Sequence, residues 1–193
     1  MKATQILLML VGLLVLGVLL GGGCVLSGYN RVVGMDEAVD NAWAEVENQL
    51  QRRYDLIPNL VETVKGIAKQ EQDVFLGIAN SRKAYFQAKT VGEKAVAAGG
   101  VERALSRLLL LRETYPQLKS NESFLKLQDQ LEGTENRLAV ARKRYNDRVR
   151  ELNTYIRQLP GRFYASLAGV KEGEYFEITA EAAKTPKVKF GES

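Results

Sequence analysis

The apolar segment at residues 6–26 places the strongest constraint on this chain, because its 21 residues are all Ile, Leu, Met, Val, Gly or Cys. An α-helix needs about 20 such residues to cross the hydrocarbon core of a bilayer. A helix packed on a soluble core would carry a polar face, and this segment has none. We therefore predict that residues 1–28 are an N-terminal membrane anchor.

Cys24 leaves two kinds of anchor open. It follows Gly21, Gly22 and Gly23, and small residues precede the modified cysteine of a bacterial lipoprotein signal. Gly21 stands where such a signal typically has leucine, and the apolar segment is long. An uncleaved transmembrane helix is therefore favoured, with cleavage and lipidation of Cys24 as the alternative.

The charges that flank the apolar segment predict its orientation. Lys2 and the amino terminus precede it, and Arg31 is the first charge after it. Cytoplasmic flanks of membrane helices carry an excess of Lys and Arg. We expect a single-pass protein of the cell (inner) membrane, with the amino terminus in the cytoplasm and the rest of the chain on the extracytoplasmic side.

The composition excludes most chemistry. The chain has 46% hydrophobic and 26% charged residues, as a folded helical protein does, but it has no histidine and one cysteine. The commonest general base, the commonest zinc ligand and any intrachain disulfide are therefore missing. No phosphate-binding loop is present either. We predict no catalytic, cofactor-binding or metal-binding residues and no small-molecule substrate.

Apolar residues recur every seven positions along two stretches, a pattern typical of helices that pack along one seam. The first stretch predicts a helix from about residue 36 into the eighties, kinked but continuous at Pro58 because the frame is the same on both sides. The second predicts a helix over residues 121–158 that Asn121 begins and Pro160-Gly161 ends. A shorter helix between them is expected to lie between Gly99-Gly100 and Pro116.

These elements predict an all-α fold. Long helices joined by short turns fold back antiparallel, so residues 29–180 are expected to form an up-and-down bundle of three to four long helices behind the N-terminal transmembrane segment. Residues 163–178 are expected to close one end of the bundle. Residues 181–193 are expected to be a flexible polar tail.

Residues 49–66, with the sequence QLQRRYDLIPNLVETVKG, resemble the signature of the LemA family. Further similarity lies at residues 36–44, 135–146, 153–156, 175–176 and 186–188, so the resemblance covers the chain from about residue 29 to 190. It implies an anchored bacterial envelope protein with an antiparallel helical bundle and no established enzymatic activity. Two departures are Gln70, where the family commonly has histidine, and Lys189, where it has an acidic residue.

The polar residues around Pro58 are the candidate site. They are Arg52, Arg53, Asp55, Asn59 and Glu62, with Arg137 and Arg142 as a matching group on the later helix. Arg53 falls on the apolar seam, so we expect it to reach Glu71 or a carboxylate of another helix. If the helices are antiparallel, Glu135 or Arg142 faces Arg53 or Asp55, and such pairs set the register of a bundle.

Two other functions remain open. Residues 137–162 carry eight Lys or Arg but only two acids, so they form a basic stripe that suits anionic lipid or an acidic partner. No nucleic-acid motif accompanies it, and no nucleic acid is expected. An enzyme would have to use Asp55 and Glu62, which lie two helical turns apart without a nucleophile.

The favoured function is a non-enzymatic, membrane-anchored scaffold of the bacterial envelope. Its expected partners are membrane lipid and either a membrane protein or a second copy of the chain.

Overall fold

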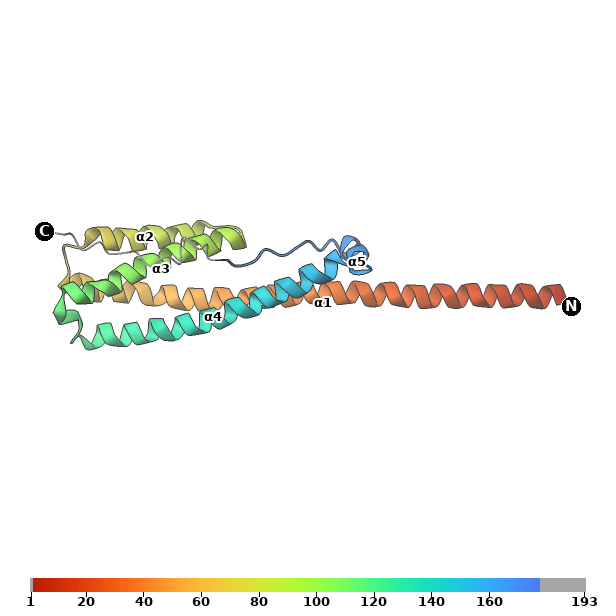
Figure 1. Ribbon diagram of the computed structural model, residues 1–193, viewed down its shortest axis with the longest axis horizontal. Helices are drawn as coiled ribbons and strands as arrows, with labels where there is room; N and C mark the ends of the chain where they lie inside the picture. Colours follow the sequence, from red (N-terminus) through yellow and green to blue (C-terminus); the bar gives the residue numbers. More distant parts are fainter. Residues whose placement is uncertain (1, 178–193) are drawn as a thin grey trace, which may run out of the picture. The chain divides into compact units, whose positions relative to one another are not determined.

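The protein is described by a computed structural model covering residues 2–177, and these residues form helices and no strand (Figure 1). The elements are α1 (Lys2–Ile67), α2 (Gln72–Gln87), α3 (Val91–Thr114), the 3-10 turn η1 (Pro116–Leu118), α4 (Glu122–Arg157) and α5 (Gly161–Ala168). The predicted all-α class is confirmed. The tail predicted at residues 181–193 lies outside the described residues.

The chain divides into two compact units. Of the described residues, the anchor unit contains 2–41 and 147–173, and the bundle unit contains 42–146 and 174–177. Helices α1 and α4 each contribute one part to both units.

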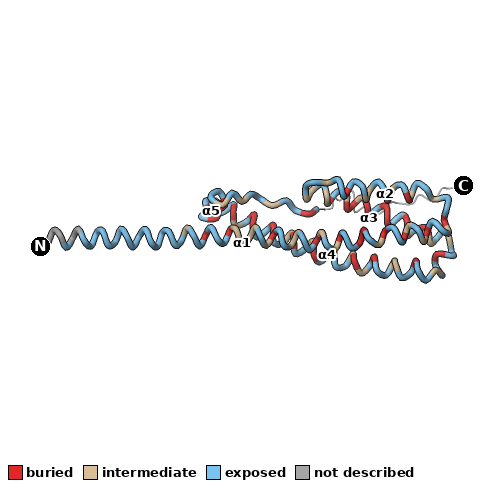
Figure 2. The backbone as a smooth tube through the Cα atoms, turned by 180° about the vertical axis from the view of Figure 1, so that it is seen from behind, coloured by how far each residue is buried: buried red, intermediate tan, exposed pale blue. Residues whose placement is uncertain are grey.

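Helix α1 contains the predicted membrane segment. Its apolar part has a mean hydropathy of 2.5 over an 18-residue window, none of which is buried. Figure 2 shows this part exposed along its length. It is long and apolar enough to cross a membrane. Cys24 lies within it and is exposed.

The helices of the bundle unit alternate in direction. Tyr54 of α1 contacts Tyr85 of α2, while Lys65 contacts Phe75, so the later α1 residue meets the earlier α2 residue. Helix α2 therefore runs antiparallel to α1. The predicted continuity of α1 through Pro58 is confirmed.

Helices α3 and α4 complete the alternation. Glu47 and Arg53 of α1 pair with Lys94 and Glu102 of α3 in the same order, so α3 runs parallel to α1. Arg53 also pairs with Glu135 of α4, and Trp43 lies 5.2 Å from Tyr145 between ring centroids, so α4 runs back along α1. The predicted up-and-down bundle is confirmed with four helices.

Two predicted boundaries are wrong. The first helix does not continue into the eighties, because α1 ends at Ile67 and a turn precedes α2. Gly99-Gly100 is not a boundary but lies inside α3. That helix begins earlier because Thr90 and Glu93 form a capping box, in which each side chain accepts the other's backbone N–H.

The start and end of α4 agree with the prediction. The side chain of Asn121 accepts the N–H of Phe124 at 2.9 Å, which caps the first turn. Beyond Arg157 the chain turns at Pro160 and forms α5, which ends at Gly169 with φ of 72°, a left-handed conformation that glycine adopts without strain.

Candidate functional site

An ionic cluster around the buried Arg53 joins three helices of the bundle unit. Arg53 of α1 is 8% exposed and pairs with Glu102 of α3 at 3.5 Å and with Glu135 of α4. Glu135 also pairs with Arg142, two turns further along α4, at 2.8 Å. The structure therefore brings together Arg53 and Arg142, and the expected carboxylate partner on another helix is found.

The charges of this ionic cluster balance, with two guanidinium groups and two carboxylates. Burial lowers the pKa of Arg53, and the negative charge of Glu102 acts in the opposite direction. Burial also lowers the pKa of Arg142, again opposed by Glu102. A buried charge is costly without its partners, so an axial shift of α3 or α4 would remove one of the two carboxylates that pair with Arg53.

An aromatic layer adjoins the cluster. Tyr54 follows Arg53 on α1, is 1% exposed and lies 4.6 Å from Tyr85 between ring centroids. Burial, and secondarily the charge of Glu47, raises the pKa of Tyr85 to about 12, so this phenol is neutral at physiological pH. The interior near Arg53 therefore contains aromatic groups and compensated charges.

The other predicted site residues lie elsewhere. Arg52, Asp55, Asn59, Glu62 and Arg137 are all exposed. Asp55 accepts a hydrogen bond from the Gln51 side chain at 2.8 Å, one turn away on the same helix. Asp55 therefore bonds within α1 and not across the bundle. Glu71, the other expected partner of Arg53, accepts a hydrogen bond from the Tyr115 hydroxyl at 3.0 Å.

Several cations of the basic stripe at residues 137–162 have acidic partners. Arg148 pairs with Glu151 at 2.8 Å, Arg150 pairs with Asp147 at 3.1 Å, and Arg157 pairs with Glu172. Arg142 belongs to the ionic cluster around Arg53. Ion pairs within the chain therefore reduce the positive charge that the stripe can offer to anionic lipid or an acidic partner.

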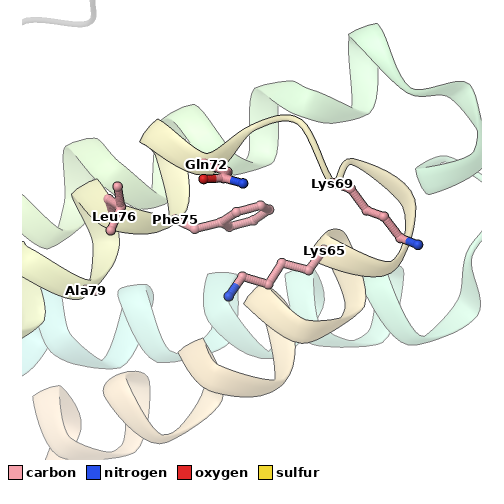
Figure 3. A pocket seen from close by; sticks show the side chains of 6 residues that line it. All are labelled: Lys65, Lys69, Gln72, Phe75, Leu76 and Ala79. Carbon is pink, nitrogen blue, oxygen red and sulfur yellow. The ribbon is translucent and has the colours of Figure 1, made fainter.

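A groove lies between the end of α1 and the start of α2, within the bundle unit. It encloses about 370 Å³ and is lined by Lys65, Lys69, Gln72, Phe75, Leu76 and Ala79. Figure 3 shows the Phe75 ring extending from α2 into the space between the helices, with Lys65 beneath it and Lys69 beyond it. The Lys65 ammonium lies 5.4 Å from the Phe75 ring centroid. The groove thus combines an apolar surface with two cations.

The α1–α2 groove was not predicted from the sequence because it depends on the turn at residues 68–71. The seven-residue frame passes unchanged from α1 into α2, so the pattern alone indicates one helix. Gly66 near the end of α1 and the polar run Lys69, Gln70 and Glu71 are the signals that favour a turn there.

Two asparagines of α4, both within stretches that resemble the LemA family, bind the backbone of the extended chain that follows α5. In the anchor unit, Asn153 donates to the carbonyl of Gly173 at 2.9 Å and accepts its N–H at 2.8 Å. In the bundle unit, Asn146 bonds both backbone groups of Phe176 in the same way, at 3.1 and 2.9 Å. Each side-chain amide therefore satisfies the backbone N–H and C=O of one residue, as a neighbouring β-strand would.

A family model matches most of this chain. The model of the LemA family matches residues 42–190, which contain the ionic cluster, the groove and Asn146 and Asn153. The chain belongs to the LemA family. The membership that the signature at residues 49–66 indicated is confirmed, and the anchoring helix is consistent with a membrane-associated family member.

This LemA-family chain is similar to three magnetosome proteins. MamQ 1 and MamQ 2 of Paramagnetospirillum magneticum are each 28% identical to it, with matches that cover 79% of this chain and 66% of the relative. MamQ of Magnetospirillum gryphiswaldense is also 28% identical, over 79% of this chain and 65% of the relative. The matches thus span slightly less than two thirds of each relative's length.

Proposed function

We propose that this LemA-family protein is a non-enzymatic, membrane-anchored scaffold that binds a membrane-protein partner. The α1–α2 groove is the observation that carries the proposal. Its apolar wall and its two lysines suit an amphipathic helix that presents acidic side chains beside its apolar stripe. Leu76, 58% exposed, extends the apolar surface beyond the groove.

A binding role fits the placement of the polar residues better than catalysis does. Asp55 and Glu62 are exposed on α1, whereas the ionic cluster around Arg53 has balanced charges. General acid–base catalysis needs carboxylates whose surroundings favour proton transfer, within reach of a bound substrate. The MamQ relatives support the membrane-associated part of the role.

We further propose that the bundle unit lies on the extracytoplasmic side. The support is the distribution of charge about the apolar part of α1, since the amino terminus and Lys2 precede it and only Arg31 follows it closely. A cysteine-labelling reagent that does not cross membranes should modify a cysteine introduced at exposed Ser120 in intact cells. Labelling only after the cells are opened would place the bundle in the cytoplasm.

Site-specific photo-crosslinking tests the scaffold. A photoreactive phenylalanine at Leu76 of the full-length chain, in native membranes, is expected to give one predominant adduct with a membrane protein. The adduct should decrease about tenfold with Lys65→Glu and Lys69→Glu together, because charge reversal repels an acidic partner. Lys126→Glu, at an exposed site on α4, is the matched charge control and should leave the adduct unchanged.

A photoreactive residue at Val140 provides the positional control, because Val140 is 50% exposed and lies on α4 outside the groove. Equal adducts from positions 76 and 140, or an adduct at 76 that the double charge reversal does not alter, would contradict binding in the groove.

A further inference from the structure

The chain leaves an apolar face of the anchor unit uncovered. Leu159, Phe163 and Leu167 are 83%, 57% and 56% exposed, and they recur every four residues through the turn before α5 and along this helix. On the other face of α5, Tyr164 and Ala165 are buried. Residues four apart share one side of a helix, so Phe163 and Leu167 form a stripe on α5, and exposed Leu159 lies in the turn just before this helix.

The position of α5 along α1 follows from a close contact. The Tyr164 ring covers Gly28 so tightly that a Cβ atom at residue 28 would lie 2.1 Å from it. Figure 1 shows α5 beside α1 at the level where the apolar part of α1 ends. Gly28 comes two residues after Leu26, the last residue of the apolar segment, or about 3 Å further along the helix axis.

That distance places α5 in the interfacial layer. The polar regions on either side of the hydrocarbon core are each about 5–8 Å thick, so a contact about 3 Å beyond the apolar segment lies among lipid headgroups. Tyr29, 37% exposed, follows Gly28, and tyrosine is enriched at this level of membrane proteins.

Cationic groups lie at the same level or one turn further along. Arg31 stacks on the Tyr155 ring at 4.7 Å from its centroid and lines a cleft of about 360 Å³ in the anchor unit. Arg162 is exposed on α5 between Leu159 and Phe163. Guanidinium groups at this depth suit the phosphates of the lipid headgroups, which lie outside the acyl chains.

We propose that α5 is an interfacial helix, whose stripe of Phe163 and Leu167 inserts, together with Leu159 of the preceding turn, into the lipid bilayer in which the N-terminal segment anchors the chain. Helices that lie in an interface bury an apolar face at the headgroup–acyl boundary and direct basic side chains to phosphate. The inference holds for either kind of anchor. If Cys24 is lipidated, Gly28 is one helical turn from the lipid, and α5 is still at the bilayer surface.

This inference is independent of the scaffold proposed above, because it concerns the anchor unit and lipid, not the α1–α2 groove and a protein. A protein partner or a second copy of the chain are the other possible occupants of the stripe, and the experiment below separates them from lipid.

Quenching by brominated lipid tests the insertion. The full-length chain with Trp43→Phe and Phe163→Trp is placed in nanodiscs whose phosphatidylcholine carries bromine near the start of the acyl chains. Emission from position 163 should be quenched about fivefold more than emission from Val140→Trp in the same Trp43→Phe background. Val140 is a matched control because it is 50% exposed on α4 in the bundle unit.

A third variant, Ser166→Trp, reports a polar exposed position of α5 and should show intermediate quenching. Circular dichroism and thermal melting confirm that each variant is folded. Equal quenching at positions 163 and 140, whether weak or strong, would overturn the proposal, because it means either no insertion or nonspecific adsorption. If the tryptophan at position 163 becomes shielded from water as the protein concentration rises, without quenching by bromine, the stripe binds a second copy of the chain.

Discussion

The anchor unit and the bundle unit use the same two helices but different interactions. In the bundle unit, α1 and α4 meet at an ion pair between the buried Arg53 and the partly exposed Glu135, and Glu102 and Arg142 complete the cluster. In the anchor unit, α1 meets α5 where the Tyr164 ring lies on Gly28. The first contact depends on charge and the second on shape.

This difference teaches what each unit has to specify. Four helices with similar apolar seams can pack in several registers, and a buried charge that needs its partner penalises the wrong ones. The contact at Gly28 instead fixes where α5 lies along α1, because only a residue without a side chain leaves room for the ring. Charge therefore defines register in the bundle unit, and a missing side chain defines position in the anchor unit.

The largest expected effect comes from Glu135→Ala, which leaves Arg53 buried with only the longer contact to Glu102. We expect the free energy of unfolding in detergent to decrease by about 3 kcal/mol, because an incompletely paired buried charge is costly. Urea denaturation measures it. Glu132→Ala, at an exposed site on α4, is the control and should change stability by less than about 0.5 kcal/mol. If the two variants are equal, the ionic cluster does not stabilise the bundle unit.

Gly28→Ala is expected to have the next largest effect. The added methyl group overlaps the Tyr164 ring, so the free energy of unfolding should decrease by about 2 kcal/mol or α5 should detach. Gly34→Ala is the matched control, because it lies in α1 with no atom within 4 Å of the added carbon. It should be neutral or stabilising by up to about 1 kcal/mol. Thermal melting and hydrogen exchange in α5 distinguish the two variants.

The two asparagines allow the same change to be made in each unit. Asn153→Ala should cost about 1 kcal/mol and accelerate amide exchange at Gly173, since that N–H loses its acceptor. Asn146→Ala should have a similar cost and accelerate amide exchange at Phe176, whose N–H loses its acceptor. Exchange measured by NMR or mass spectrometry is expected to change only at the matching residue. Acceleration at both residues in either variant would show that the two units open together.

The smallest effects are on pH dependence, and their signs differ between the units. In the bundle unit, N–H groups of Lys89 and Thr90 lower the pKa of Glu93, so its contribution to stability is present above its ordinary pKa of 4.5 and lost as pH falls through the lowered value. In the anchor unit, burial and the charges of Asp40 and Glu37 raise the pKa of Asp36. Its contribution is present below the ordinary pKa of 3.8 and lost as pH rises through the raised value.

Two substitutions test these signs. Glu93→Gln should destabilise the protein at neutral pH but not in acid, whereas Asp36→Asn should stabilise it at neutral pH but not in acid. Melting temperatures across the acidic range measure both. Parallel curves for a variant and the unchanged chain would contradict the assigned interaction.

Local signals predicted the ends of α4 because each acts within a few residues. Asn121 caps the helix through the N–H of Phe124, and Pro160 cannot continue a helical hydrogen-bond ladder. The pairing of Arg53 with a carboxylate of another helix also followed from the sequence, since a charge on an apolar seam requires a partner. The pair between Arg53 and Glu135 was among the facing pairs expected from antiparallel helices, whereas Glu102 was not predicted, because it lies on the separate helix α3.

Other features needed the fold. The seven-residue frame is the same before and after residues 68–71, so periodicity does not indicate the turn that creates the α1–α2 groove. Gly99-Gly100 resembles a turn in isolation, but neighbouring alanines and the capping box at Thr90 keep it helical within α3. Asn146 and Asn153 were part of the family resemblance, and only the path of the later chain explained them.

The sequence by itself determined the class of the protein. An apolar segment long enough for a bilayer, two long apolar seams and the absence of histidine together define an anchored helical bundle with few routes to chemistry. The tertiary structure decided the partners of Arg53, the groove and the exposed stripe on α5. These depend on contacts between residues far apart in the chain, and their distances are set by packing, which local propensity and periodicity do not encode.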